Sequence, residues 1–251
     1  QIDNLYAAGK TIDGTFMIPH HYGDDGWYGF SKDLSIHELV KIYLWSMDPK
    51  DLKRISQDSW ISFLLGKNPK YPEEALNKDL SSIRSSMDRV RNDPTSPDTR
   101  LADWLLENGF NPVTTTDLVQ LMTGGQLYEG MDRTSGILHC RVRYFDPEKR
   151  RAGVPEDVAS LVTAMDMKMT KVTLVNTNQV EPRDVIVQTG AYGEHQCVRV
   201  ETGDKVYPVN SRFFYVRLEP GTGAELVIYA NRYANTPTMA FPWHGNTQPS
   251  H

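Results

Sequence analysis

The chain has 251 residues, of which 39% are hydrophobic and 24% are charged, and its formal net charge is −5. This composition is typical of an ordinary globular protein. No apolar run approaches the roughly 20 residues of a transmembrane helix, and the acidic balance argues against general nucleic-acid binding. We therefore expect no membrane span and no nucleic-acid partner. The length suffices for one large domain or two modest ones.

The sequence begins at Gln1, with no initiator methionine and no signal-peptide pattern in the residues that follow. Such a start is typical of a mature or internally excised chain, and a cut after a secretion signal fits as well as a cut inside a longer polypeptide. We favour the second, because the helical segments that come next do not look sufficient for a domain of their own.

Residues 1–125 are expected to form a helical region. Residues 12–30, rich in glycine, histidine, aspartate and aromatic residues, are interpreted as a loop. After it, apolar side chains recur at helical spacing in several segments. The expected helices are 35–47, 51–65, 72–90 and 117–122. Helices with broad apolar faces and long connections make a poor independent domain, so this region is interpreted as the end of a larger helical assembly.

From residue 126 onward the apolar pattern alternates, as it does in β-strands. The expected strands are 137–145, 171–176, 184–189, 196–201, 205–209, 212–219 and 224–232. One helix, at 155–166, is expected to interrupt them. Short strands with marked turns favour an antiparallel β-sandwich over residues 134–243. The predicted fold is therefore α+β, with helical hairpins in residues 1–125 followed by a sandwich domain in residues 126–251.

The two cysteines permit one disulfide, but period-2 alternation places them on different faces of their strands. Cys140 shares a face with core residues such as Val142, whereas Cys197 lies opposite the neighbouring valines. We therefore expect two free thiols, with Cys140 facing the core and Cys197 facing away from it.

The order of helical hairpins, linker and antiparallel sandwich resembles the C-terminal part of secreted bacterial enzymes built on an (α/α) toroid. Many polysaccharide lyases and some glycoside hydrolases have this layout. Residues 22–30, Tyr-Gly-Asp-Asp-Gly-Trp-Tyr-Gly-Phe, look like a loop between toroid helices, and residues 175–183 look like a turn of accessory β-domains. The resemblance implies a location outside the cytoplasm. It also implies that a larger polypeptide or a second chain completes the toroid.

The loop contains the strongest candidates for catalysis, because it gathers imidazoles, carboxylates and aromatic rings within nine residues. Such a mixture suits sugar chemistry, in which rings stack on pyranose faces and polar groups transfer protons. The candidate catalytic residues are His20, His21, Tyr22, Asp24 and Asp25. Trp27 and Tyr28 are candidate substrate-binding residues. In a lyase, Tyr22 or His21 would remove the proton beside a uronate carboxylate, and in a hydrolase Asp24 or Asp25 would act as acid or base.

Other interpretations of this loop remain open. Its His and Asp residues could cap neighbouring helices while its aromatic residues fill the core. Alternatively, His20, His21 and Asp24 could hold a divalent metal such as calcium or zinc, although no regular metal-ligand spacing supports this. We expect no cofactor, because the chain lacks the usual nucleotide-binding motifs.

Arg141 and Arg143 are further candidates for substrate binding. With His139 they alternate with core residues, so the three side chains should share one face of a strand. An arginine-lined face suits a carboxylate ligand or an anionic polymer, whereas an ordinary solvated face is the simpler interpretation.

Three functional hypotheses follow. The first is a carbohydrate-active enzyme of the toroid type, either a polysaccharide lyase or a glycoside hydrolase. The second is a non-catalytic β-sandwich module for surface assembly or binding. The third is a toroid-type lyase or hydratase with a small non-sugar substrate, in which Tyr22, Asp24 and Asp25 perform acid–base chemistry.

Overall fold

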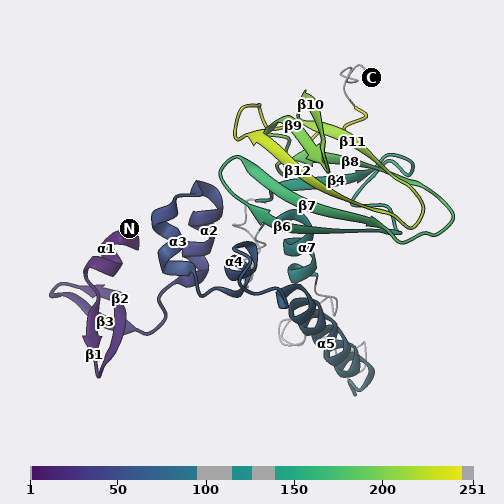
Figure 1. Cartoon of the computed structure of the whole chain (residues 1–251). Helices are drawn as coiled ribbons and strands as arrows, with labels where there is room; N and C mark the ends of the chain where they lie inside the picture. Colours follow the sequence, from purple (N-terminus) through teal and green to yellow (C-terminus); the bar gives the residue numbers. More distant parts are fainter. Residues whose placement is uncertain (1, 95–114, 126–138, 245–251) are drawn as a thin grey trace. The chain divides into compact units, whose positions relative to one another are not determined.

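The computed structural model describes residues 2–94, 115–125 and 139–244, which form a mixed α+β protein with antiparallel sheets (Figure 1). The chain divides into two compact units, Gln1–Ile61 and Ser62–His251. This division differs from the boundary predicted between residues 125 and 126. Helices that were assigned to the N-terminal domain belong to the same unit as the strands.

The first unit combines short helices with a three-stranded sheet in the order β1-β2-β3. Its elements are α1 (Ile2–Ala7), β1 (Lys10–Ile12), β2 (Thr15–Gly23), β3 (Gly26–Ser31), α2 (Ile36–Ser46) and α3 (Pro49–Ile55), and α4 (Ser59–Leu64) spans the division. Helix α2 packs on α3 through a stripe that includes Leu39, Tyr43 and Leu44. Asp48 caps α3, since its carboxylate accepts a hydrogen bond from the Lys50 amide at 3.0 Å.

The predicted loop at residues 12–30 is wrong, because most of it forms the β2–β3 hairpin. Asp24 and Asp25 form its two-residue turn, and Gly26 has a φ of +92°. An Asp-Gly pair beside a reversal is a hairpin signal. Irregular pairing hid the strands, since the register shifts twice between Pro19 and Tyr22. These shifts break the simple alternation by which a strand is detected in a sequence.

The second unit begins with α5 (Tyr71–Arg91) and α7 (Thr116–Thr123), and α7 links α5 to the strands. The Tyr71 hydroxyl donates to Gln120 Oε1 at 2.9 Å, which joins the two helices. On the other side, the Tyr144 hydroxyl donates to the carbonyl of Met122 at 2.8 Å. These contacts explain why the helices belong to the same unit as the strands.

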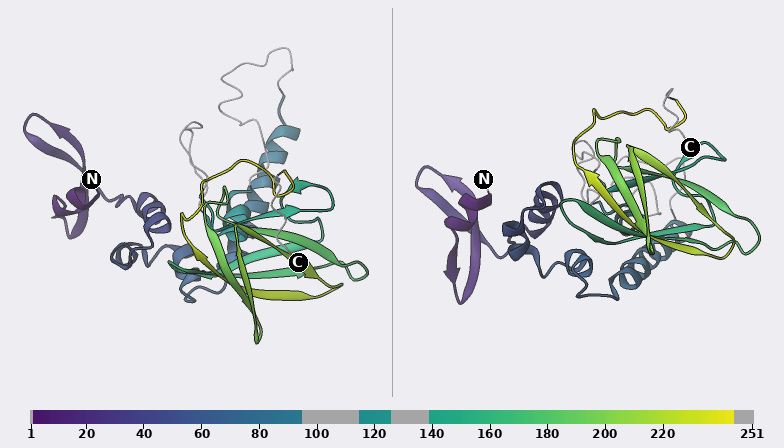
Figure 2. Two further views of the ribbon diagram at one scale, coloured as in Figure 1. Left: turned by 90° about the horizontal axis from the view of Figure 1, so that it is seen from above. Right: turned by 45° about the horizontal axis from the view of Figure 1, so that its top comes forward.

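Two antiparallel sheets form a sandwich-like pair in the second unit (Figure 2). The five-stranded sheet has the order β10-β9-β12-β7-β6, and the four-stranded sheet has the order β11-β8-β4-β5. The strands are β4 (Val142–Asp146), β5 (Arg151–Ala152), β6 (Val158–Met165), β7 (Met169–Asn176), β8 (Arg183–Thr189), β9 (Gln196–Thr202), β10 (Lys205–Ser211), β11 (Phe213–Leu218) and β12 (Gly223–Asn231). Fully buried side chains on both sheets, such as Val187 and Leu174, form the core. The strands predicted from alternation are confirmed within a few residues, except at the start of the first, which lies outside the described residues.

The helix predicted at 155–166 is wrong, because β6 occupies Val158–Met165. Val158 and Val162 are buried by ordinary alternation, and the register then shifts between Val162 and Ala164. The shift places Met165 on the buried side as well. Buried positions at i, i+4 and i+7 in a bulged strand therefore reproduce the spacing of a helix.

The two cysteines are free thiols, as predicted, but both are buried. The exposed face predicted for Cys197 is wrong. Arg199 pairs with Tyr229 and Cys197 pairs with Ala230, so Val198 is an extra residue in β9. This bulge turns Cys197 to the same side as the buried Val200.

Strand β10 is one edge of the five-stranded sheet as described. It carries the exposed Val206 and Tyr207, followed by Pro208. Its pairing with β9 shifts between Pro208 and Ser211, where Asn210 has a φ of +49°. Asparagine tolerates this left-handed conformation better than most residues. The bulge redirects the chain from β10 into β11.

Candidate functional site

The β2–β3 hairpin gathers all seven of the candidate site residues predicted in the first unit. His20, His21 and Tyr22 lie on β2, Asp24 and Asp25 form the turn, and Trp27 and Tyr28 lie on β3. All seven side chains are exposed, Tyr22 by 70% and Tyr28 by 68%. The hypothesis that these aromatic residues fill the core is therefore wrong. Three exposed aromatic side chains, Tyr22, Trp27 and Tyr28, thus gather on one hairpin.

The aromatic rings of the hairpin contact one another in two groups. Tyr22 and Trp27 are paired across the strands, and their ring centroids lie 4.9 Å apart at 76°. His21 lies 4.0 Å from His20 and 5.5 Å from Tyr28, measured between ring centroids. The Tyr22–Trp27 and His20–His21 contacts are edge-to-face, and such contacts restrict the orientation of the rings.

A glycine makes room for one of these rings. A Cβ atom at Gly29 would lie 2.6 Å from Nδ1 and 2.9 Å from the Cβ of His21. Those separations are well below van der Waals contact. The imidazole of His21 therefore lies directly over the backbone of β3, and a side chain at position 29 would displace it.

Asp24 and Asp25 place two carboxylates at the exposed tip of the hairpin. Neither makes a hydrogen bond or ion pair with the residues that the structure describes. Within residues 2–94, 115–125 and 139–244, no group of three or more His, Cys, Asp and Glu side chains could hold a metal ion. The arrangement offers proton-transfer groups beside stacking surfaces.

Arg141 is buried and hydrogen bonded within the protein, and it does not lie on a solvated face. It is 4% exposed, and its guanidinium donates to the Thr170 hydroxyl and the Met169 carbonyl, both at 3.2 Å, and to the Asp166 carbonyl. Gly124 covers its side chain from the other side, since a Cβ there would lie 3.3 Å from the Arg141 Cβ. Arg141 therefore fastens the β6–β7 turn to the start of β4.

Arg143 is also engaged within the second unit. Its guanidinium donates to the Ala191 carbonyl at 3.1 Å and lies 5.0 Å from the centroid of the Phe145 ring. His139 is 6% exposed. The solvated face predicted for these three residues is therefore wrong, because α7 and neighbouring turns cover it. Both arginines belong to the second unit, whereas the hairpin belongs to the first.

The segment 175–183 that looks like an accessory-domain turn has a structural role. The Asn176 amide, fully buried, donates to the carbonyl of Glu181 at 2.8 Å and to those of Leu218 and Glu219 at 3.3 Å. Arg183 donates to the Asp157 carboxylate at 2.6 Å. Hydrogen bonds from Asn178 and Arg183 lower the pKa of Asp157. These bonds join the segment between β7 and β8 to the end of β11 and to Asp157, which precedes β6.

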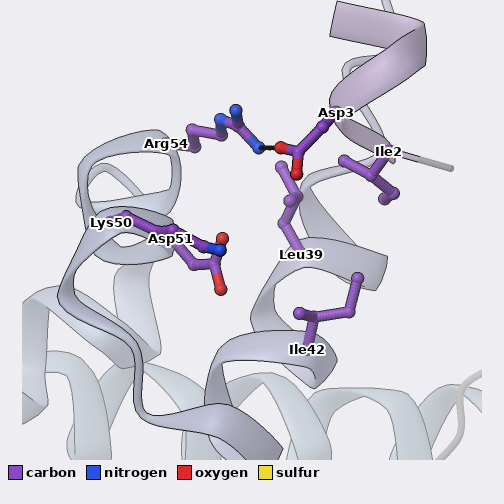
Figure 3. A pocket seen from close by; sticks show the side chains of 7 residues that line it. All are labelled: Ile2, Asp3, Leu39, Ile42, Lys50, Asp51 and Arg54. Atoms are coloured by element: carbon purple, nitrogen blue, oxygen red, sulfur yellow. Dashed lines mark hydrogen bonds and ion pairs between the residues drawn. The ribbon is translucent and has the colours of Figure 1, made fainter.

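The first unit also contains a cavity of about 360 Å³ between α1, α2 and α3 that sequence patterns did not indicate (Figure 3). Leu39 and Ile42 provide an apolar side, and Lys50, the buried Asp51 and Arg54 line the other. Arg54 donates to Asp3 at 2.7 Å, which lowers the pKa of that carboxyl group. The one sequence feature that could have indicated this cavity is the spacing of Lys50 and Arg54, which lie four residues apart and therefore on one helix face.

The described residues thus define a mixed α+β protein with an exposed aromatic hairpin and a sandwich-like pair of sheets. Residues 55–119 match a domain of unknown function, DUF8034. No curated protein and no solved structure matches the chain. No helix among the described residues is both long enough and apolar enough to cross a membrane.

Proposed function

We propose that this chain functions in a carbohydrate-active enzyme, a polysaccharide lyase or a glycoside hydrolase, and that the β2–β3 hairpin contacts the glycan. In this proposal the helical segments belong to a toroid-type domain, the sheets form its supporting sandwich, and the enzyme acts outside the cytoplasm. One observation carries the proposal. The exposed Tyr22, Trp27 and Tyr28 stand beside His21 and two carboxylates on one hairpin.

The chemistry of these side chains suits sugars. Aromatic rings offer flat apolar surfaces to the C–H faces of a pyranose, while imidazole, phenol and carboxylate groups bind its hydroxyls. In a lyase reaction, Tyr22 or His21 would accept the proton beside the uronate carboxylate. The glycosidic C–O bond would break as the C=C bond forms, and an acid such as Asp24 would protonate the leaving oxygen.

Binding tests the first part of the proposal. The full chain would be run through native gels that contain pectin, alginate, xylan or no polysaccharide. Tyr22→Ala/Tyr28→Ala should lose at least tenfold of the affinity for any glycan that retards the wild type, because the two most exposed rings are removed. Tyr215→Ala is the matched control, since Tyr215 is 57% exposed on β11. Retardation that survives the double substitution would refute the assignment of the hairpin.

Turnover tests the second part. The protein would be incubated with the same polysaccharides, together with the chains encoded beside it, and assayed for unsaturated products and new reducing ends. His21→Ala and Asp24→Ala should abolish turnover and leave thermal unfolding nearly unchanged, since both side chains are exposed. Wild-type turnover that persists in both variants would exclude them as catalytic residues.

A non-catalytic glycan-binding module is the second candidate. The exposure of all seven candidate side chains favours it, because catalysis usually requires a site from which water can be excluded. Glycan binding that depends on Tyr22 and Tyr28, with no turnover of any polysaccharide, would support this candidate over the first.

A further inference from the structure

A cleft of about 430 Å³ in the second unit lies where the ends of several strands meet the segment after β12. Gln188 from β8, Asn210 from β10, and Arg212 between β10 and β11 line it. Asn235 and Phe241, from the segment that follows β12, line it as well. This volume lies within the range of small-ligand sites and accommodates one or two sugar rings.

The part of the cleft formed by the segment after β12 is fixed in place. The side-chain amide of Asn235 donates to the carbonyls of Gly193 at 3.1 Å and His195 at 2.9 Å. The backbone amide of Thr238 donates to the Tyr192 carbonyl at 2.9 Å. Phe241 packs against the buried cluster of the four-stranded sheet, 5.9 Å from the Phe145 centroid. A wall held in this way loses little conformational entropy when a ligand binds.

The cleft carries positive charge without a counter-ion. Arg212 is its one lining cation, and no acidic side chain lines it. The guanidinium of Arg212 makes no hydrogen bond or ion pair with any residue that the structure describes. Its Cδ lies 3.1 Å from where a Cβ at Gly193 would stand, so the stem of the arginine rests on the Gly193 backbone.

The other lining groups can recognise hydroxyls. The amide nitrogen of Gln188 donates to the Gly190 and Ala191 carbonyls at 3.3 Å, which leaves its oxygen as an acceptor. The side-chain nitrogen of Asn235 likewise donates to two carbonyls, which leaves its side-chain oxygen as an acceptor. Asn210, in its left-handed conformation at the bulge, makes no side-chain hydrogen bond within the described residues. A bulge with an unusual backbone angle beside a cleft is a frequent mark of a binding site.

We propose that this cleft binds a carboxylate-bearing sugar, such as a uronic acid residue of an oligosaccharide. The fork of Arg212 would pair with the carboxylate in a bidentate manner. The amides of Gln188, Asn210 and Asn235 would bind the ring hydroxyls, and Phe241 would contact the apolar side of the ring. This site lies in a different unit from the hairpin, so the inference does not depend on the proposed function.

The test uses the full chain carrying Tyr22→Ala/Tyr28→Ala, so that binding by the hairpin does not interfere. Calorimetric titration would compare tri-galacturonate with the neutral maltotriose. Tri-galacturonate should bind at least tenfold more tightly, because maltotriose cannot pair with Arg212. Arg212→Gln should remove that difference. Arg217→Gln, on the neighbouring β11 and outside the cleft, should leave it unchanged.

Two further variants keep the test decisive if Arg212→Gln does not fold. Arg212→Lys retains the charge without the bidentate fork and should bind tri-galacturonate less tightly than the parent. Asn210→Gly suits the backbone angle and should weaken both sugars. Equal affinity for the two sugars, no effect of the Arg212 substitutions, or displacement of tri-galacturonate by acetate at similar concentrations would each overturn the proposal.

Discussion

Burial governs the reactivity of the two cysteines. It raises the pKa of Cys140 and of Cys197 to about 12, so that almost no thiolate exists in the folded protein near neutral pH. We expect Ellman's reagent to modify neither thiol in the native protein at pH 8 and both thiols in 6 M guanidinium chloride. Rapid modification of one thiol in the native state would contradict the burial described for it.

A buried histidine should make the stability depend on pH. Burial, reinforced by the charges of Arg141 and Arg232, lowers the pKa of His195 from 6.5 to about 3. Its Nδ1 accepts a hydrogen bond from the Tyr233 amide at 3.1 Å. Below pH 6.5 the unfolded chain binds a proton at this residue that the folded chain does not bind, so the free energy of unfolding falls as the pH is lowered towards 3.

We expect this residue to contribute a loss of about 3 kcal/mol in the free energy of unfolding between pH 7 and pH 4. His195→Gln can still accept the Tyr233 hydrogen bond but cannot take up the proton. Urea unfolding at several pH values should therefore show a shallower pH dependence in His195→Gln than in the wild type. Identical pH dependence in both proteins would be evidence against a neutral His195.

At the scale of the element, irregular strands mark the limit of sequence interpretation. Strand positions in the second unit were predictable because their alternation is regular over five or more residues. The bulges in β6, β9 and the hairpin each shift that alternation by one residue. One strand was thus taken for a helix, one cysteine was assigned to the wrong face, and one hairpin was taken for a loop.

The candidate site was predictable in its residue types but not in its geometry. The density of His, Asp and aromatic residues between positions 20 and 28 indicated a candidate site in this segment, although the segment was interpreted as a loop and not as a hairpin. The wrong prediction of a solvated face for Arg141 has a different origin. Alternation indicates on which face of a strand a side chain lies, but it does not indicate what covers that face. Here α7 covers it, and no local pattern in the sequence reports a contact between segments so far apart.

The turn between β7 and β8 should be one of the most sensitive elements. Asn176→Ala would leave three backbone carbonyls without their buried donor, and a buried polar group without a partner is costly. We expect a loss of about 2 to 4 kcal/mol in the free energy of unfolding, measured with urea. Asn231→Ala, an exposed asparagine at the end of β12, should change it by less than about 0.5 kcal/mol. Similar losses in both variants would argue against this role.

At the scale of the whole molecule, the division into two compact units predicts two unfolding transitions. Leu44→Ala in α2 and Ile186→Ala in β8 each create a cavity at a fully buried position, costing about 2 to 5 kcal/mol. In differential scanning calorimetry, each substitution should lower the transition of its own unit and leave the other in place. A single transition lowered by both substitutions would show that the units unfold together.

The edge strand β10 has a consequence for the protein at high concentration. Exposed strand edges with apolar residues such as Val206 and Tyr207 invite a second copy to add its own strand, the route to fibrous polymers. Pro208 has no amide hydrogen to donate, and the bulge before Ser211 twists the edge away from a flat partner. Pro208 and the bulge that follows it are therefore features that disfavour growth of the five-stranded sheet between molecules.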